Sequence, residues 1–163
     1  MDLSGFTTFV ERNGLDRASE ELTLARSTIR ILTSTHGVRV DKWLGDGALI
    51  IGTVTTSVLR AVLEIEAEVD ANGALPLRAG ITTGPAMVFE GDDYIGGPLN
   101  LAAKLCHLAG PGQVLVPAEM ASRYQGDVAV VSRFSADVPG IGMFELAELR
   151  LPEAVDEGLR KAE

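Results

Sequence analysis

The stretch DKWLGDG, residues 41–47, places a lysine and a carboxylate four residues apart, at Lys42 and Asp46. The residues before it favour extended structure, and the apolar run at 48–51 is typical of a buried strand. The connection between the two strands therefore falls at Gly45, Asp46 and Gly47, because glycine and aspartate tolerate the positive φ angles of a tight turn. By itself, Asp46 would be interpreted as an ordinary turn residue.

A second carboxylate has similar surroundings. Asp2, in MDLSGFT, is followed by a small, polar loop that contains Gly5, Phe6 and Thr7. Two carboxylates in such positions, with no histidine nearby, suit a hard metal ion, and the backbone amides of the loop suit a phosphate group. Oxygen ligands select Mg²⁺ or Mn²⁺, and two ions would allow one to activate a hydroxyl group while the other holds a triphosphate.

The composition is that of one globular domain, since 46% of the 163 residues are hydrophobic and 23% are charged. We expect this domain to cover residues 1–150 and a charged tail to cover 151–163. The net charge of −9 argues against affinity for nucleic acid or for an anionic membrane. The single cysteine, Cys106, excludes an internal disulfide and a cysteine-based metal site.

No apolar run approaches the roughly 20 residues that a membrane-spanning helix needs, and the N-terminus lacks a signal-peptide pattern. The sequence therefore predicts a soluble, cytoplasmic protein without a membrane partner in this segment. The first strand ends near Leu3 and is very short, as if it were truncated at the N-terminus.

The pattern of apolar residues predicts the elements that must position these groups. Helices are predicted at 15–35, 56–71, 99–108 and 118–124, strands at 1–3, 38–44, 48–51, 77–81, 86–89, 113–116, 128–133 and 143–149, and an acidic turn at 90–93. This order predicts an α+β fold, a ferredoxin-like split βαβ sandwich in which helices cover one face of a mostly antiparallel sheet. The loops at Asp2 and Asp46 would then lie side by side at one end of the sheet.

Five segments, in this order and at this spacing, resemble the catalytic domain of the bacterial class III nucleotidyl cyclases: DLSGFT, KWLGDG, RAGITTGP, GDDYIGGPLNLAAKL and GPGQVLV. The resemblance extends from Asp2 to about Leu149. Each segment alone is a weak signal, whereas five in register argue against chance. The resemblance implies the split βαβ fold of that family and the conversion of ATP to cyclic AMP and pyrophosphate by a two-metal mechanism.

The resemblance also implies roles for individual residues. Those at the family's metal positions are Asp2, Leu3 and Asp46, and those at its phosphate-binding loop are Gly5, Phe6 and Thr7. Lys42 falls at the position that reads the purine, and Asp93 at the position of its partner. A Lys and Asp pair is associated with adenine, because lysine donates to ring N1 and aspartate accepts from the exocyclic amine. Guanylyl activity is therefore disfavoured.

Two further positions of the family fall on the helix predicted at 99–108. Asn100 corresponds to the residue that orients the ribose, and Lys104 to an arginine that neutralises charge at the α-phosphate. The spacing of i and i+4 directs both side chains from one helix face. The resemblance further implies a head-to-tail homodimer with sites at the interface. The metal-binding aspartates of each site come from one subunit, and its partner supplies Lys42, Asp93, Asn100 and Lys104. Regulatory domains in a longer chain would accompany this catalytic domain.

Two departures from the family pattern weaken the catalytic interpretation. Lys104 keeps the positive charge of arginine but loses its bidentate fork. Near residues 135–142 the family often has a further basic residue, and here Arg133 is the only nearby cation. The alternative is a catalytically weak or inactive cyclase-like domain that binds nucleotide, dimerises and serves a regulatory role.

Each assigned residue also has a simpler interpretation. Asp93 would be a solvated charge, Asn100 a helix cap and Lys104 a surface residue. Trp43 would be a core or interface aromatic, Tyr94 and Ile95 core residues or a wall of the purine pocket, and His36 and His107 structural or solvent-facing.

A phosphodiester-handling enzyme of another family on the same type of sheet fits poorly, because it leaves the Lys42 and Asp93 pairing unused.

Overall fold

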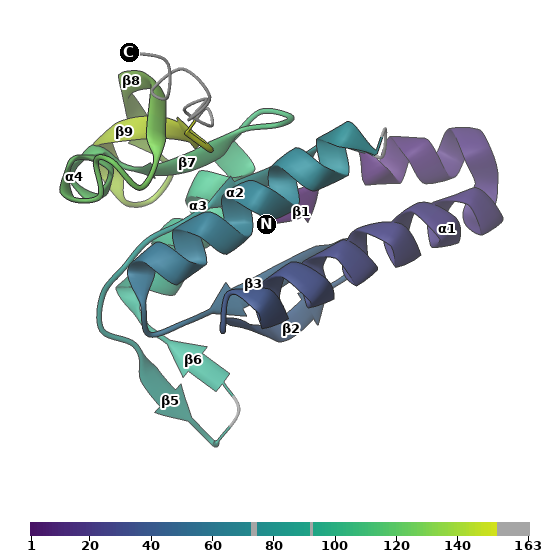
Figure 1. Ribbon diagram of the computed structural model, residues 1–163, viewed down its shortest axis with the longest axis horizontal. Coiled ribbons are helices and arrows are strands. Elements are labelled where there is room, and N and C mark those ends of the chain that lie inside the picture. Colours follow the sequence, from purple (N-terminus) through teal and green to yellow (C-terminus); the bar gives the residue numbers. More distant parts are fainter. Residues whose placement is uncertain (73–74, 92, 153–163) are drawn as a thin grey trace, which may run out of the picture.

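The computed structural model describes residues 1–72, 75–91 and 93–152, and five strands of this part form the central sheet. Their order is β1 (Asp2–Leu3), β4 (Leu77–Gly80), β7 (Val114–Pro117), β9 (Gly142–Arg150) and β8 (Ala129–Val138). Strands β4 and β7 are parallel, and the other neighbours are antiparallel. The predicted α+β fold with a mostly antiparallel sheet is confirmed (Figure 1).

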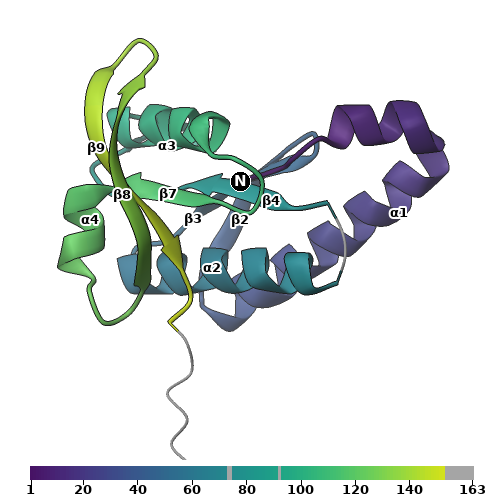
Figure 2. The same cartoon turned by 90° about the horizontal axis from the view of Figure 1, so that it is seen from above.

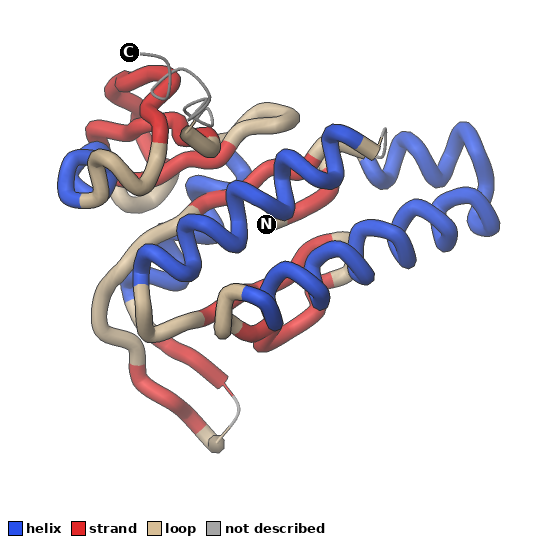
Figure 3. The backbone as a smooth tube through the Cα atoms, viewed as in Figure 1, coloured by secondary structure: helices blue, strands red, loops and turns tan. Residues whose placement is uncertain are grey.

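Two hairpins flank this sheet. One consists of β2 (Arg39–Leu44) and β3 (Gly47–Ile51), and the other of β5 (Met87–Phe89) and β6 (Asp93–Ile95). The first hairpin contacts the edge of the sheet at the N-terminus, where the amide of Ala48 donates to the carbonyl of Met1 (3.0 Å) and the Met1 ammonium donates to the carbonyl of Ala48 (3.1 Å). The second hairpin projects from the body of the molecule (Figure 3).

Helices cover both faces of the sheet rather than one. Helix α2 (Thr55–Ala71) shares a buried cluster with Val114 and Val116 of β7, whereas Leu105 of α3 (Gly97–Leu108) packs with Leu115 of the same strand. Because successive strand residues point to opposite faces, α2 and α3 must lie on opposite sides of β7, as Figure 2 shows. The short helix α4 (Ala118–Arg123) follows β7.

The first helix is longer than its sequence pattern predicts. Helix α1 (Phe6–Thr35) begins directly after the loop at Gly5 and is kinked at Gly14, where the backbone is not helical (φ 81°, ψ 170°). The kink interrupts the apolar periodicity, and the pattern therefore indicated a helix only from residue 15. The C-terminal part of α1 lies beside α2 and buries Ala25 and Ile29 with it in one cluster.

Two other boundaries differ from those predicted. Asp93 begins strand β6 instead of ending an acidic turn, because Phe89 and Asp93 are paired across a hairpin. Strand β8 continues to Val138, five residues beyond its predicted end, and alternate residues of this extension pack against α3. Of the tail expected at 151–163, residues 153–163 lie outside the described part of the chain. No helix in the described ranges combines the length and the apolar character that crossing a membrane requires.

Gly80 allows α3 to approach the sheet closely. A Cβ atom at this position would lie 2.3 Å from the carbonyl oxygen of Ala102 and 2.6 Å from the amide nitrogen of Cys106, both in the backbone of α3. We expect Gly80→Ala to lower the free energy of unfolding by about 1–3 kcal/mol, as for other overpacked sites. The measurement is urea denaturation followed by circular dichroism.

The matched control for this variant is Gly97→Ala, because a Cβ atom at Gly97, at the start of α3, would meet no atom within 4 Å. We expect it to change the free energy of unfolding by less than about 0.5 kcal/mol. Equal stability of the two variants would show that α3 does not depend on the absence of a side chain at Gly80.

Candidate active site

The carboxylates of Asp2 and Asp46 lie next to one another at the edge of the sheet. The backbone bonds between Met1 and Ala48 hold β1 against β3, so that Asp2 faces the turn that carries Asp46. Gly47 makes this approach possible, because a Cβ atom there would lie 2.7 Å from the carbonyl oxygen of Met1 and 3.2 Å from Oδ1 of Asp2. Any side chain at position 47 would therefore push the two carboxylates apart.

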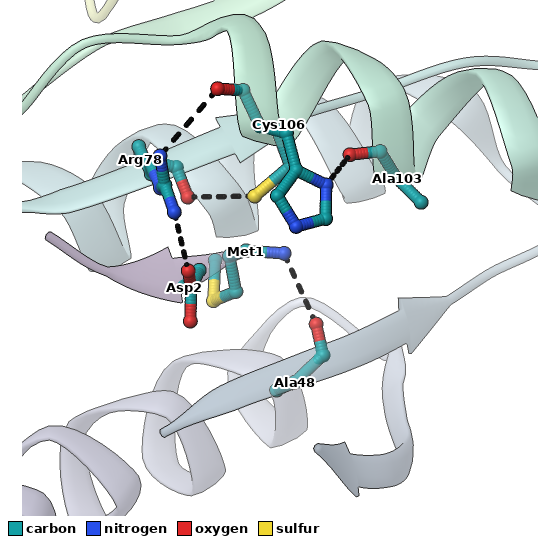
Figure 4. Close-up of polar contacts among 7 residues, drawn as sticks. Met1, Asp2, Ala48, Arg78, Ala103 and Cys106 are labelled. Carbon is teal, nitrogen blue, oxygen red and sulfur yellow. Dashed lines mark hydrogen bonds and ion pairs between the residues drawn. The ribbon is translucent and has the colours of Figure 1, made fainter. Parts of the chain in front are cut away.

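The charge of this pair is partly balanced by Arg78. Strand β1 pairs with β4 so that Asp2 lies opposite Arg78, and Nη2 of Arg78 is 2.9 Å from Oδ2 of Asp2 (Figure 4). Nη1 of the same guanidinium is 3.5 Å from the carbonyl oxygen of His107 in α3. Arg78 lies in the segment RAGITTGP, but no local feature of the sequence indicates that it faces a residue 76 positions earlier.

Burial raises the pKa of the Asp46 carboxyl above its ordinary value, and the negative charge of Asp2 raises it further. A backbone hydrogen bond and the charge of Arg78 act in the opposite direction without cancelling the effect. The site therefore resists the accumulation of two negative charges when no cation is bound.

This donor set fits a hard divalent cation. Carboxylate oxygens are the ligands that Mg²⁺ and Mn²⁺ prefer, and a cation would relieve the repulsion that raises the pKa of Asp46. The described residues contain no group of three or more His, Cys, Asp or Glu side chains that could hold a metal ion. Further ligands would have to be backbone carbonyls, water or phosphate oxygens. Leu3 is buried and its side chain has no ligand atom, so this residue could contribute only its carbonyl oxygen.

The predicted phosphate loop lies at the N-terminus of α1. Gly5 adopts the left-handed conformation (φ 78°) immediately before the helix, and Thr7 is exposed. The side chain of Phe6 packs against the cluster that contains Leu3, so only its backbone faces the loop. Amides of a first helical turn have no partner within the helix and carry a partial positive charge. This end of α1 is thus suited to a phosphate group.

Lys42 and Asp93 are brought together from two hairpins. Nζ of Lys42 on β2 lies 2.7 Å from Oδ1 of Asp93 on β6, which also accepts a hydrogen bond from the amide of Tyr94 (2.9 Å). The hydrogen bond from Lys42 is the main cause that lowers the pKa of the Asp93 carboxyl, and the hydrogen bond from the amide of Tyr94 is the next. The hydroxyl of Tyr94 accepts a hydrogen bond from Arg39 (2.7 Å), which links the same two hairpins a second time.

Asn100 and Lys104 lie on α3, one turn apart. Asn100 is exposed, and its side chain makes no hydrogen bond to any residue that the structure describes. Nζ of Lys104 donates to the carbonyl oxygen of Pro139 (2.5 Å) at the tip of the β8–β9 hairpin. Arg133, the nearby cation in sequence, instead bonds to the carbonyl of Ala118 and the hydroxyl of Ser122 and is thereby held on α4.

The two histidines have structural contacts. Nε2 of His36 lies 2.7 Å from Oε2 of Glu64, which joins the end of α1 to α2, and Nδ1 of His107 lies 2.9 Å from the carbonyl of Ala103. Neither contact links a histidine to the carboxylate pair.

A groove of about 660 Å³ runs between the β2–β3 hairpin, β4 and α3. A volume of this size is typical of sites for small molecules. Its walls include Asp2, Gly47 and Tyr94, but not Asp46, Lys42, Asp93, Asn100 or Lys104. The predicted site residues are therefore distributed around this groove and do not converge within it in one chain.

Comparison with known proteins reveals relatives in sequence, although no protein-family model matches the chain. An uncharacterized protein of Mycobacterium tuberculosis is 31% identical over 120 residues, or 73% of this chain. The putative adenylate cyclase 3 of Rhizobium meliloti is 33% identical over 124 residues, and a pH-sensitive adenylate cyclase of M. tuberculosis is 32% identical over 116 residues; each alignment covers 71% of this chain. The chain spans 32%, 21% and 29% of the lengths of these relatives, respectively.

Solved structures share the fold. The adenylyl cyclase CyaB from Pseudomonas aeruginosa superposes with a TM-score of 0.77 at 18% identity, over 94% of this chain and 92% of that chain. The guanylyl cyclase Cya2 superposes with a TM-score of 0.65 at 21% identity, over 95% of this chain and 91% of that chain. Because enzymes for both purines have this fold, the fold alone does not distinguish ATP from GTP.

The raised pKa of Asp46 leads to a prediction about stability. Because folding raises the pKa of the Asp46 carboxyl, the protonated form favours the folded state. This contribution to stability is fully present at pH values below the ordinary pKa of aspartate. It is lost as the pH rises through the raised pKa of the folded state, above which the charged carboxylate disfavours folding. Without metal, Asp46→Asn should therefore melt at a higher temperature than the wild type at pH 7. The difference should shrink as the pH is lowered to 4. Thermal unfolding in EDTA, followed by circular dichroism, measures both.

The control is Asp16→Asn, at an exposed position of α1, which should leave the melting curve unchanged at each pH. A lower melting temperature for Asp46→Asn at pH 7 would contradict the prediction, because it would mean that the charged carboxylate stabilises the metal-free fold.

Proposed function

Because this chain belongs to the class III nucleotidyl cyclase catalytic domains, we propose that it converts ATP to 3′,5′-cyclic AMP and pyrophosphate. The observation that carries the choice of ATP is the contact between Lys42 and Asp93. An adenine base would insert between a donor and an acceptor that already face one another: Lys42 would donate to N1 and Asp93 would accept from the exocyclic amine. The curated relatives that are named adenylate cyclases support the same choice.

The roles of the remaining residues follow from their chemistry. Asp2, Asp46 and the carbonyl of Leu3 would hold two Mg²⁺ or Mn²⁺ ions, and the amides of Gly5, Phe6 and Thr7 would donate to phosphate oxygens. The bound ions would lower the pKa of the ribose 3′-hydroxyl and neutralise charge on the triphosphate. Asn100 would orient the ribose, and Lys104 would stabilise the charge that develops on the α-phosphate.

The reaction forms one bond and breaks another. The 3′-oxygen bonds to the α-phosphorus while the bond from that phosphorus to the bridging oxygen of the β-phosphate breaks, which releases pyrophosphate and a proton. The residues of the chain contribute by alignment and by charge, because an in-line displacement at phosphorus depends mainly on these two factors.

We further propose that the active unit is a head-to-tail homodimer. The groove reaches Asp2 but none of the side chains assigned to the purine and the ribose, so a complete site would need those side chains from a second copy. The β5–β6 hairpin supports this arrangement, because Met87, Val88 and Phe89 are 46–59% exposed and would be covered by a partner.

A second candidate function is favoured by the surroundings of Lys104. Its ammonium group already donates to Pro139, and Arg133 is held on α4, so few cations remain for the phosphates. A domain of this kind could bind nucleotide and dimerise while it catalyses poorly. That domain would have a regulatory role.

The first test measures cyclic nucleotide production by the purified chain with Mn²⁺ and either ATP or GTP. We expect cyclic AMP from ATP, little or no cyclic GMP, and loss of at least about a hundredfold in activity for Asp46→Ala, because a metal ligand is removed. Asp16→Ala is the control and should keep full activity. Equal or greater cyclic GMP formation would refute the choice of adenine, and an active Asp46→Ala variant would refute the metal site.

The second test addresses Lys104. Lys104→Arg should raise the turnover number by about tenfold or more. Both side chains carry one positive charge, but arginine can donate two parallel hydrogen bonds to phosphate oxygens, whereas lysine acts as a point charge. Lys104→Gln, which removes the charge, should abolish turnover. Absence of activity in the wild type and in Lys104→Arg, with nucleotide binding retained, would favour the regulatory domain over the enzyme.

A further inference from the structure

Two arginines of α1 lie over the indole ring of Trp43. Trp43 follows Lys42 on β2, and successive side chains of a strand point to opposite faces, so the indole lies on the face away from Asp93. The Cζ atoms of Arg26 and Arg30 are 4.7 Å and 5.0 Å from the centroid of the indole ring. Both distances are within the range of a cation–π interaction. The two arginines are one helical turn apart and thus share one face of α1.

Arg26 makes one contact that Arg30 does not make. Its Nη2 atom donates a hydrogen bond of 2.7 Å to the carbonyl oxygen of Gly45, the residue directly before Asp46. Its Nε atom is buried without a partner among the described residues. The guanidinium of Arg26 therefore contacts the hairpin twice, with Cζ over the indole and Nη2 at the carbonyl of Gly45.

The turn at 45–47 needs such an anchor. Gly45 is in the left-handed region (φ 66°), and glycine on both sides of Asp46 leaves the backbone with little intrinsic preference for one conformation. On the side of β1, the backbone bonds between Ala48 and Met1 hold the residues that follow the turn. The bond from Arg26 restrains the turn from the side of α1.

We propose that Arg26 is a positioning residue for Asp46. It holds the Gly45 carbonyl so that the Asp46 carboxylate stays beside Asp2 and ready to bind a divalent cation, while Arg30 only stacks on Trp43. The part of this inference that concerns the cation rests on the proposed function. The part that concerns the turn does not.

The test compares Arg26→Gln with a matched control, Arg30→Gln, which loses a cation over the same indole but no bond to the turn. Arg26→Lys is the rescue variant, because lysine keeps a donor that can reach the Gly45 carbonyl. Trp43 is the single tryptophan of the chain. Its fluorescence reports whether each variant has lost its contact with the indole, and circular dichroism checks that each variant is folded.

Two measurements on the metal-free chain decide the outcome. Amide hydrogen exchange at residues 45–47 should be faster in Arg26→Gln than in the wild type and unchanged in Arg30→Gln. Binding of Mn²⁺ without nucleotide, measured by electron paramagnetic resonance, should weaken by about tenfold or more in Arg26→Gln, as when residues that orient metal ligands are removed. It should change less than about twofold in Arg30→Gln and recover in part in Arg26→Lys.

Several results would overturn the inference. These are unchanged exchange and Mn²⁺ affinity in Arg26→Gln, or equal effects in Arg26→Gln and Arg30→Gln, which would assign the effect to stacking on Trp43. If the wild type binds no Mn²⁺, the metal site of the proposed function fails. The exchange data then still decide whether Arg26 holds the turn: faster exchange only in Arg26→Gln supports the inference, and unchanged exchange refutes it.

Discussion

The arrangement of the site depends on the two-sided pairing of β1. This strand contains only Asp2 and Leu3, yet it pairs with β4 on one side, and the adjoining Met1 bonds to β3 on the other. Through these contacts the N-terminus joins the β2–β3 hairpin to the central sheet. The missing side chain at Gly47 lets the hairpin approach Met1 and Asp2 closely. Without this contact, the two carboxylates would belong to separate parts of the molecule.

Charge in the site is balanced locally. The chain has a net charge of −9, so the proposed nucleotide substrate could be attracted only by specific groups. Arg78 offsets one carboxylate, the N-terminus of α1 offers amides, and Lys104 contributes one ammonium group. A divalent cation would supply the remaining positive charge. The raised pKa of the Asp46 carboxyl reflects this balance, and the proposed metal-dependent reaction would use the same two carboxylates.

Single elements of the fold serve more than one purpose. Strand β2 presents Lys42 to Asp93 on one face and Trp43 to the arginines of α1 on the other. Helix α3 packs closely on Gly80 and carries Asn100 and Lys104. A change in the core beneath either element would therefore move these candidate site residues, even where none of them is altered.

The sequence by itself determined the α+β class, most helices and strands, and the turn at Gly45 to Gly47, because these depend on local periodicity and on residues that tolerate particular φ angles. The sequence also indicated Asp2 and Asp46 as two carboxylates that would lie side by side at one end of the sheet. Tertiary structure alone decided that helices cover both faces, that Asp93 begins a strand, and that Arg78 and Arg26 contact the carboxylate region. The contacts of Arg26 and Arg78 join residues 19 and 76 positions apart, respectively, and local propensity carries no signal for such contacts.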